Sequence, residues 1–355
     1  MTSQQPGALA EAAAIQRYLD GPDPSNLLGL NFGFAQSRVL DVALEMGIFT
    51  LLARESRSAA ALAQNLDCDL DGIERLLEAL VELGLLEASA AGHYAVTPAS
   101  ETYLVRGGAS YLGQHLAEVM RQWARWESLV DVVRSGSSRG DLGSLRARGA
   151  HPGMFAANFP VAIRLAHRVA KQVRVPLGGQ ILDLTAGAGE WGIALALHHP
   201  SVTVTAHDDP TLLSVTRARV AEFDLADRFT FVPANFAAPP FPDVHFDLVV
   251  FAQVGRFIGA EVTGRLVREC ARMLRPGGQV LIADVLKNSP GRQAAPRSML
   301  NLSLLVNTPR GRLLERSEYL AYLVDAGLWP RGEMTGGLVS VLLGAKGVEP
   351  ACEGS

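Results

Sequence analysis

One segment constrains the fold of this chain more than any other: a short apolar run that ends in an acid and is followed closely by three glycines. Residues 180–193 read QILDLTAGAGEWGI, with Asp183 at the end of the apolar run and Gly187, Gly189 and Gly192 after it. Glycines at such a turn let the backbone bend sharply and approach a ligand closely, where a Cβ would collide. The segment predicts a buried strand, a ligand-binding turn and the start of a helix.

The rest of the C-terminal half repeats this alternation of strand and helix. After the first strand at 180–185, further apolar strands are expected at 202–207, 229–233, 246–252 and 278–284, with helical segments between them. Such alternation is typical of βαβ units and a parallel sheet. We therefore expect an α/β, Rossmann-like doubly wound domain, whose ligand lies outside the carboxyl ends of the strands.

The acids of this domain indicate which nucleotide cofactor it binds. Asp183 stands four residues before the first glycine. A carboxylate there would repel a pyrophosphate but would attract the ammonium group of S-adenosylmethionine (SAM). Asp208 ends the second strand, where an acid accepts hydrogen bonds from both ribose hydroxyls. The adjacent Asp209 is favoured as the N-cap of the next helix because Pro210 follows it, although the sequence alone leaves both acids open as ribose ligands.

Other loops at the same edge of the sheet supply further candidate cofactor contacts. Asn235 follows the third strand, where its amide suits the edge of the adenine and Phe236 suits the adenine face. A plain turn residue is the alternative for Asn235, since asparagine is common in turns. Thr185 in the glycine loop and Gln253 after the fourth strand complete the expected cofactor-binding set.

The N-terminal half shows helices followed by a short hairpin. Apolar residues recur at helical spacing over 27–52, two helical stretches follow at 58–65 and 71–84, and residues 93–97 alternate as a strand does. This is the order of a winged helix, a fold best known for DNA binding. Residues 1–105 carry five basic and fourteen acidic side chains, a net charge of −9 that is the wrong sign for a phosphate-facing surface. A packing and dimerisation module is favoured.

Composition agrees with two folded domains and excludes several classes of protein. The 355 residues are 48% hydrophobic and carry a net charge of −4, so neither disorder nor a general attraction to nucleic acid or membrane is expected. Three scattered cysteines and the lack of ligand spacing predict no disulfide and no metal site. Without a signal peptide or a membrane-length apolar run, we expect a cytoplasmic protein. The expected domains are a flexible lead-in at 1–25, a winged-helix dimerisation domain at 26–105, a helical linker with substrate-pocket helices at 106–178, a SAM-binding domain at 179–346 and a C-terminal tail at 347–355.

Taken together, these motifs resemble the SAM-dependent small-molecule O-methyltransferases of plant caffeate type and their actinobacterial relatives, which modify polyketides and other secondary metabolites. The resemblance runs from 32–40 to 319–327 and is carried by the glycine loop at 183–192, the D-x-P at 208–210 and LRPGG at 274–278. It implies an enzyme of antibiotic or other secondary metabolism that takes its methyl group from SAM. It also implies a homodimer formed through the winged-helix domain.

One departure from the family pattern bears on the chemistry. After the fourth strand the family usually has H-D-W, whose histidine is the general base, whereas this chain has Arg256 at that position. An arginine stays protonated and removes no proton. In a first interpretation the enzyme methylates oxygen by proximity and orientation, with Arg256 stabilising a phenolate or enolate. In a second, the fold hydroxylates, decarboxylates or cyclises instead; a SAM-sensing DNA-binding regulator is a third, disfavoured by charge.

The resemblance also implies a substrate pocket between the helical linker and the helix that follows the fifth strand. Ordinary core packing is the alternative for its aromatic and methionine members, and carbon and nitrogen acceptors stay open beside oxygen. The expected pocket residues are Trp123, Met154, Phe155, Asn158, Phe159, Met299, Asn301 and Leu304.

Overall fold

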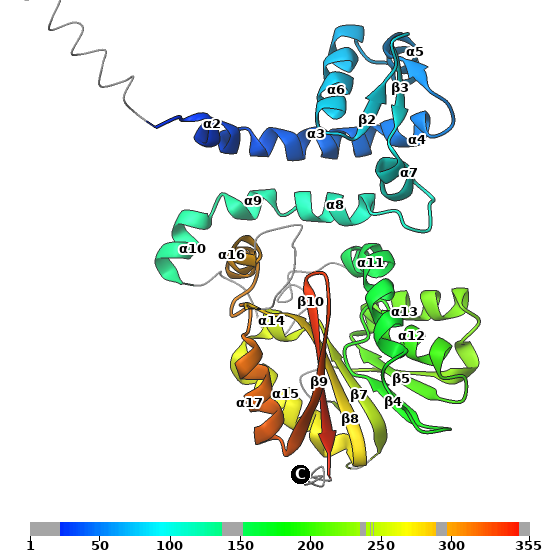
Figure 1. Cartoon of the computed structure of the whole chain (residues 1–355), viewed down its shortest axis with the longest axis vertical. Coiled ribbons are helices and arrows are strands. Elements are labelled where there is room, and N and C mark those ends of the chain that lie inside the picture. The colour runs from blue at the N-terminus through cyan, green and yellow to red at the C-terminus, as the bar shows by residue number, and fades with distance from the viewer. Residues whose placement is uncertain are drawn as a thin grey trace, which may run out of the picture. The chain divides into compact units, whose positions relative to one another are not determined.

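The computed structural model divides into two compact units, Met1–Glu101 and Thr102–Ser355, and each unit contains one sheet among the described residues (Figure 1). No helix in the described part of the chain is long and apolar enough to cross a membrane. The described residues are 22–136, 152–234, 239–241, 243, 245–288 and 297–347.

The first unit has the expected winged-helix order, with a small antiparallel sheet β1-β3-β2. The single helical stretch expected over 27–52 is wrong, because Gly47 adopts a left-handed φ of 73° and ends the second of three helices. The side chains of Ser58 and Asp69 cap the next two helices by accepting backbone N–H bonds. The elements are α2 (Ser25–Asn31), α3 (Gly33–Met46), α4 (Ile48–Leu52), β1 (Arg57–Ser58), α5 (Ala59–Leu66), α6 (Leu70–Glu82), β2 (Leu86–Ala88), β3 (His93–Val96) and α7 (Pro98–Leu104).

The second unit is built on a seven-stranded sheet of order β6-β5-β4-β7-β8-β10-β9. The ladders from β6 to β8 are parallel, whereas β10 is antiparallel to both of its neighbours. This order is that of a doubly wound Rossmann-like sheet with an inserted antiparallel strand. The strands are β4 (Gln180–Asp183), β5 (Thr203–Asp208), β6 (Phe229–Pro233), β7 (Phe246–Ala252), β8 (Leu274–Val285), β9 (Leu328–Gly336) and β10 (Val339–Lys346).

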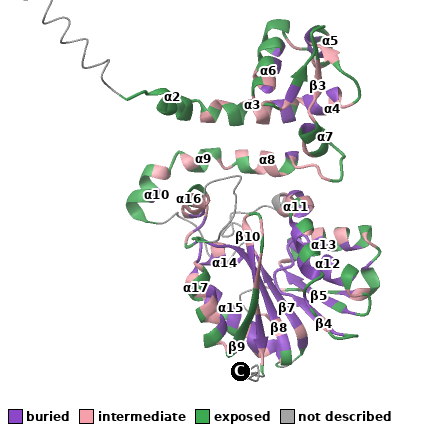
Figure 2. Ribbon diagram, in the orientation of Figure 1, coloured by how far each residue is buried: buried purple, intermediate pink, exposed green. Residues whose placement is uncertain are grey.

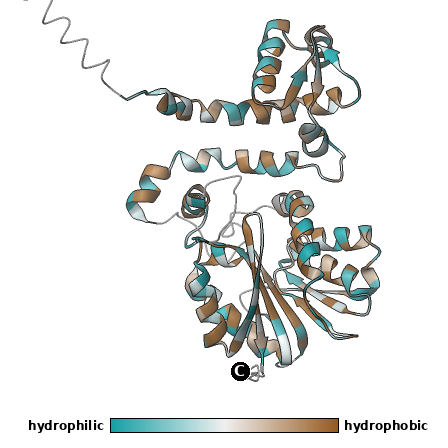
Figure 3. Ribbon diagram, viewed as in Figure 1, coloured by the Kyte–Doolittle hydropathy of each residue, from teal (hydrophilic) through white to brown (hydrophobic). Residues whose placement is uncertain are grey.

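Hydrophobic cores cover both faces of this sheet, as burial in Figure 2 and hydropathy in Figure 3 both show along β7 and β8. Neighbouring residues point to opposite faces, so that Ile181 belongs to one core and Leu182 to the other. The first core also contains residues of α11 (Pro152–Ala170), α12 (Glu190–His198) and α13 (Pro210–Glu222). The second contains residues of α15 (Ala260–Met273) and α17 (Arg316–Asp325).

Two features of the sheet differ from the sequence-based expectation. Strands β9 and β10 were not expected, and β10 lies beside β8 in an antiparallel register. The fifth strand begins at Leu274 rather than at 278, but its ladder to β7 passes from Leu274 to Gln279, so the intervening RPGG forms an irregularity outside the pairing. Gly277, with a φ of 78°, accounts for that bend.

The helical segment before the sheet belongs to the second unit. Helix α8 packs against α11, and the Arg164 side chain on α11 donates hydrogen bonds to Tyr103 and Ser110. Helix α16 contacts both α9 and α10. The remaining elements are α8 (Gly113–Met120), α9 (Trp123–Trp126), α10 (Leu129–Ser135), the 3₁₀ turn η2 (Ala226–Arg228), α14 (Gly255–Ile258) and α16 (Arg297–Asn307).

Candidate functional site

The candidate site lies where the strand order of the sheet reverses. Strand β4 pairs with β5 on one side and with β7 on the other, so the chain crosses over in opposite directions from this point. Such a reversal opens a crevice at the carboxyl ends of the strands. Three of the strands that meet here end in or beside an acid: Asp183, Asp208 and Asp284.

The glycine loop crosses this edge in a conformation that only glycine adopts without strain. Gly187 and Gly189 have φ values of 56° and 87°. A Cβ on Gly189 would lie 2.9 Å from the side chain of Thr216, and a Cβ on Gly187 would lie 3.2 Å from the ring of Phe155. Side chains are therefore excluded at both positions, and the loop is a backbone turn without side chains there, called the glycine cradle below. Phe155, expected in the substrate pocket, contacts this cradle.

The two adjacent acids after β5 have separate structural roles. Asp208 is fully buried, and its carboxylate accepts hydrogen bonds from the backbone N–H of Gly187 at 3.0 Å and of Asp209 at 2.8 Å. Asp209 is the N-cap of α13, where its side chain accepts from the N–H of Thr211 at 2.9 Å. The capping role expected for Asp209 is confirmed. Asp208 lies against the glycine loop, and its ribose role stays a prediction.

Two carboxyl groups at the base of the loop are buried, and each has an oxygen without a hydrogen-bond partner among the described residues. Asp183 Oδ2 accepts from the N–H of Gly192 at 3.0 Å, while Oδ1 has no partner. Glu190, the first residue of α12, leaves Oε2 without one. Burial, together with the neighbouring Glu190, raises the pKa of Asp183 to about 8. Burial likewise raises the pKa of Glu190 to about 7.

These residues fit SAM. An unpartnered buried acceptor at Asp183 suits a ligand ammonium group, since a buried polar atom without a partner is costly unless something binds it. The glycine cradle presents backbone without side chains, and the buried Asp208 carboxylate lies directly against it. The expected adenine contacts, Asn235 and Phe236, lie outside the described residues.

The side chains of Thr185 and Gln253 have partners within the protein. Thr185 Oγ1 donates to the carbonyl of Ala252 at 3.0 Å and accepts from its N–H at 3.2 Å, which joins β4 to β7. Gln253 has a φ of 58°, unusual for a side-chain-bearing residue, and its Oε1 accepts from Arg256. Backbone strain of this kind is frequent at ligand sites. The cofactor roles of both residues stay predictions.

Arg256, at the position of the family's base histidine, forms a buried ion pair. Its guanidinium donates from Nη1 to Asp284 Oδ1 at 2.5 Å and from Nη2 to Gln253, and its side chain is only 12% exposed. The Asp284 carboxylate also accepts from the Tyr319 hydroxyl at 2.7 Å and from the backbone N–H of Arg256 and Val285. Arg256 thus ties α14 to the end of β8, and any action on a substrate has to be compatible with this pairing.

The expected pocket residues on α11 and α9 occupy different environments. Asn158 is half-buried, and its contact with a substrate stays a prediction. Phe159 is buried against Phe223, with the guanidinium of Arg219 5.0 Å from its ring centroid, which is the environment of a core residue. Trp123 is 47% exposed. The side chain of Met154 lies outside what the structure describes.

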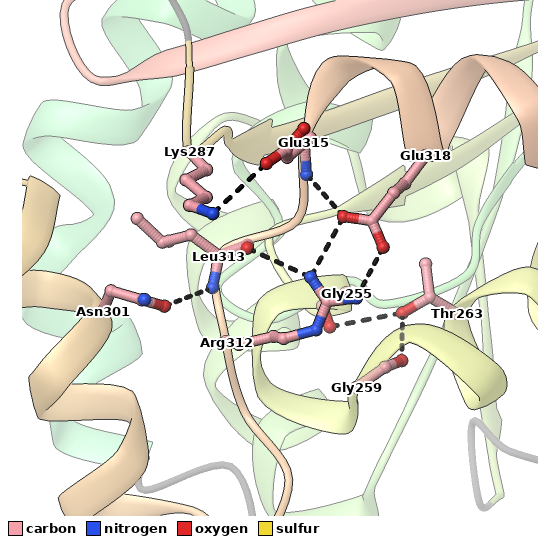
Figure 4. Close-up of polar contacts among 9 residues, drawn as sticks. All are labelled: Gly255, Gly259, Thr263, Lys287, Asn301, Arg312, Leu313, Glu315 and Glu318. Carbon is pink, nitrogen blue, oxygen red and sulfur yellow. Dashed lines mark hydrogen bonds and ion pairs between the residues drawn. The ribbon is translucent and has the colours of Figure 1, made fainter.

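The expected pocket residues on α16 are held partly by the protein itself. Asn301 accepts a 2.7 Å hydrogen bond from the backbone N–H of Leu313 through its amide oxygen (Figure 4). Leu304 is buried in a small core with Val285 and Leu313. Met299 is half-exposed. Asn301 and Leu304 therefore position the segment that follows α16, and their contact with a substrate stays a prediction.

Figure 4 shows how that segment is fixed. Arg312 pairs with Glu318 on α17 and also donates to the carbonyl of Leu313, while Lys287 pairs with Glu315 at 3.2 Å. Glu315 and Glu318 form a reciprocal capping box at the start of α17. The network holds the segment beside α14, where the N–H of Arg312 donates to the carbonyl of Arg256.

Sequence reasoning missed three residues of this site. Glu190 directly follows Gly189 of the loop, so it was close enough to the motif to have been noticed. Asp284 ends the fifth strand as Asp208 ends the second, so the same signal was present. Nothing local marked Tyr319, whose role depends on the approach of α17 to β8.

The fold and the site define a SAM-dependent methyltransferase. An O-methyltransferase dimerisation domain matches residues 28–106, and a methyltransferase domain matches residues 181–278. The chain belongs to the O-methyltransferase family that combines these two domains.

Individual relatives cover most of the chain. Acetylserotonin O-methyltransferase of Mus musculus is 30% identical over 328 residues, which are 85% of this chain and 82% of that protein. The tetracenomycin polyketide synthesis 8-O-methyl transferase TcmO of Streptomyces glaucescens is 27% identical over 311 residues, 86% and 91% of the two chains. The structure of human N-acetylserotonin methyltransferase in complex with SAM superposes with a TM-score of 0.78 over 93% of this chain and 99% of that one, at 24% identity. The two curated relatives are named as methyltransferases, which together with the matched methyltransferase domain supports methyl transfer, the first interpretation, rather than the second.

Proposed function

We propose that this methyltransferase transfers the methyl group of SAM to a hydroxyl oxygen of a small aromatic, polyketide-like metabolite. The observation that carries the proposal is the similarity along both domains to TcmO and to acetylserotonin O-methyltransferase. Both names specify oxygen as the methylated atom. The carboxyl edge of the sheet, with its cradle and buried acids, supplies the cofactor half of such a reaction.

Several residues of this edge would hold the cofactor. Asp208 would accept from the ribose hydroxyls, Asp183 would face the ammonium group, and the backbone of Gly187 and Gly189 would line the methionine part. SAM, when bound, supplies an electrophilic methyl group on a positively charged sulfur. The protein's task is then to bring a nucleophilic oxygen into line with that methyl group, and orientation of this kind supplies up to roughly 7–11 kcal/mol of a barrier.

The acceptor hydroxyl would have to lose its proton without a general base at position 256. The Arg256 guanidinium forms an ion pair with Asp284, and a guanidinium does not accept a proton. Burial and the neighbouring Asp284 raise the pKa of Tyr319 well above its usual value, so its hydroxyl stays protonated. A phenol, with a pKa near ~10 or lower when conjugated, loses its proton far more easily than an aliphatic alcohol. This chemistry favours an acidic phenolic hydroxyl as the acceptor.

We also propose that the enzyme works as a homodimer joined through its first unit. The residues of α2 and the start of α3 expose an apolar surface that a monomer would leave in water. This surface lies within the region that matches the dimerisation domain. Its members are Leu27, Leu28, Leu30, Phe32 and Phe34, each more than half exposed.

A screen of acceptors tests the proposed reaction. The purified protein and SAM are incubated with hydroxylated aromatic polyketides, with their O-methylated forms and with amine analogues, and the products are analysed by mass spectrometry. We expect one methyl group to be added to a phenolic oxygen, and Asp208→Ala to abolish the product at limiting SAM. Methylation of the amines alone, or SAM-dependent conversion without a mass gain of one CH₂, would overturn the proposal.

A further inference from the structure

Two buried carboxyl groups meet at the glycine loop without a cation. Asp183 is 1% exposed and Glu190 is 9% exposed, and neither forms an ion pair with any described residue. Each carries an oxygen, Oδ1 and Oε2 respectively, that no donor in the described structure reaches. Buried charges are ordinarily paired, because an uncompensated charge in a protein interior is expensive. The arrangement lacks a positive partner.

The surroundings of the pair confirm that the protein itself supplies no such partner among the described residues. Within the described ranges, the further charge that acts on the pair is that of Asp208 on β5, which is also negative. The backbone N–H groups of Ala188 and of Glu190 itself lower the pKa of the Glu190 carboxyl, but less than burial raises it. His207, next to Asp208, directs Nδ1 to the carbonyl of Leu184 at 2.9 Å. The ionisable groups of α11, which packs on α12, are Arg164, His167 and Arg168, and all three are exposed.

We propose that Glu190 acts with Asp183 as a two-carboxyl receptor for the ammonium group of the cofactor, and that the pair releases a proton when the ammonium binds. The inference rests on the assignment of SAM as the cofactor. It adds Glu190 as a ligand of the ammonium group and the release of a proton on binding. The ammonium, rather than the sulfonium, is the chosen charge because the pair lies at the end of β4 and the start of α12, beside the part of the loop assigned to the methionine end.

The proton follows from the protonation state of the free protein. Burial raises the pKa of Asp183 to about 8 and that of Glu190 to about 7, with repulsion from Glu190 adding to the first and from Asp208 to the second, so below pH 7 both hold protons most of the time. A bound cation favours the charged carboxylate and lowers the pKa, so binding expels a proton. Affinity for the cofactor should therefore rise as the pH increases toward 7.

Calorimetric titration at pH 6.5 in two buffers of different ionisation enthalpy measures this proton directly. At that pH the ligand's α-amino group, with a pKa of about 7.7–8.0, is already protonated in solution. We expect on the order of one proton released per SAM and the same for S-adenosylhomocysteine, which keeps the ammonium but lacks the sulfonium. 5′-Methylthioadenosine, which lacks the ammonium, should bind without proton release. Release with SAM alone would assign the pair to the sulfonium and overturn the proposal.

A variant tests whether Glu190 binds the ammonium group or only lies near the site as a bystander. Glu190→Gln should weaken the binding of SAM and S-adenosylhomocysteine about tenfold and leave 5′-methylthioadenosine binding unchanged, which also verifies that the site is folded. A bystander would behave in the opposite way, because removing its repulsion lowers the pKa of Asp183 and favours cation binding. Glu222→Gln, on the exposed side of α13, is the matched control.

The outcomes distinguish this inference from the proposed function. Cofactor binding without proton release, or Glu190→Gln binding SAM as tightly as the native protein, overturns the ammonium receptor and leaves methyl transfer standing. If the native protein binds neither SAM nor S-adenosylhomocysteine, the receptor and the proposed function are overturned together.

Discussion

Replacing Arg256 by alanine should destabilise the second unit, because the Asp284 carboxylate would stay buried without its cation. Asp284 is 2% exposed and is held by Arg256, Tyr319 and two backbone N–H groups. Removing one partner of a buried ion pair costs about 3–5 kcal/mol. Since the backbone N–H groups and the Tyr319 hydroxyl remain, we expect the lower end, about 3 kcal/mol.

Thermal unfolding followed by circular dichroism measures this loss. For a unit of this size, one kcal/mol corresponds to roughly 2–4 °C, so the unfolding temperature should fall by about 6–12 °C. Lys287→Ala is the control, because it breaks an exposed pair with Glu315 in the same unit, and such pairs contribute at most ~1 kcal/mol.

A double substitution identifies the cause. In the Arg256→Ala background, Asp284→Asn removes the unpaired charge and should recover part of the lost stability. An unfolding temperature within about 2 °C of the native protein for Arg256→Ala, or a double variant less stable than Arg256→Ala alone, would refute the ion-pair reasoning.

Five further predictions concern the carboxyl edge of the sheet and Arg256. Asp208→Ala should weaken SAM binding at least tenfold, about 1.4 kcal/mol, in calorimetric titration. Asp209→Ala should instead cost about 1 kcal/mol of stability through its lost cap and keep SAM affinity; the reverse result would exchange their roles. Arg256→Ala should lower turnover more than SAM affinity in steady-state kinetics and titration, and a loss of affinity alone would place Arg256 in the cofactor site. Gly189→Ala should destabilise the protein by at least about 1–2 kcal/mol, seen in thermal unfolding, because its φ is 87°; an unchanged melting temperature would contradict the cradle. Without cofactor, thermal stability should fall as the pH rises from about 4 toward 8, because the native state with its raised carboxyl pKa values binds more protons than the unfolded chain. Asp183→Asn should make this pH dependence less steep. An equally steep pH dependence in the variant would contradict the assignment to Asp183.

Local patterns in the sequence were sufficient for the five parallel strands β4 to β8, the glycine loop and the two adjacent acids at the end of β5. A strand with apolar residues on both faces is buried wherever it is placed, and Gly187 and Gly189 are needed because of their own φ angles. The N-cap role of Asp209 was foreseen for the same reason, since an N-cap is defined by the residues that follow it.

The partners of charged side chains were decided by the tertiary structure. Arg256 at the base position suggested a free cation, whereas the parallel pairing of β7 with β8 brings Asp284 to it from 28 residues away. Asn301 was expected to contact substrate, yet its amide holds the N–H of Leu313, which comes close only because of how the segment after α16 returns. Such pairings depend on which strands are neighbours.

What the sequence by itself determined was the family, the doubly wound sheet and the glycine loop, because each depends on residues close together in the chain. Only the tertiary structure decided the position of β10 between β8 and β9, the pairing of Arg256 and the burial of Glu190 beside Asp183. Burial and charge pairing are set by the full three-dimensional surroundings of a group, and those surroundings give the acids at the glycine loop their raised pKa values.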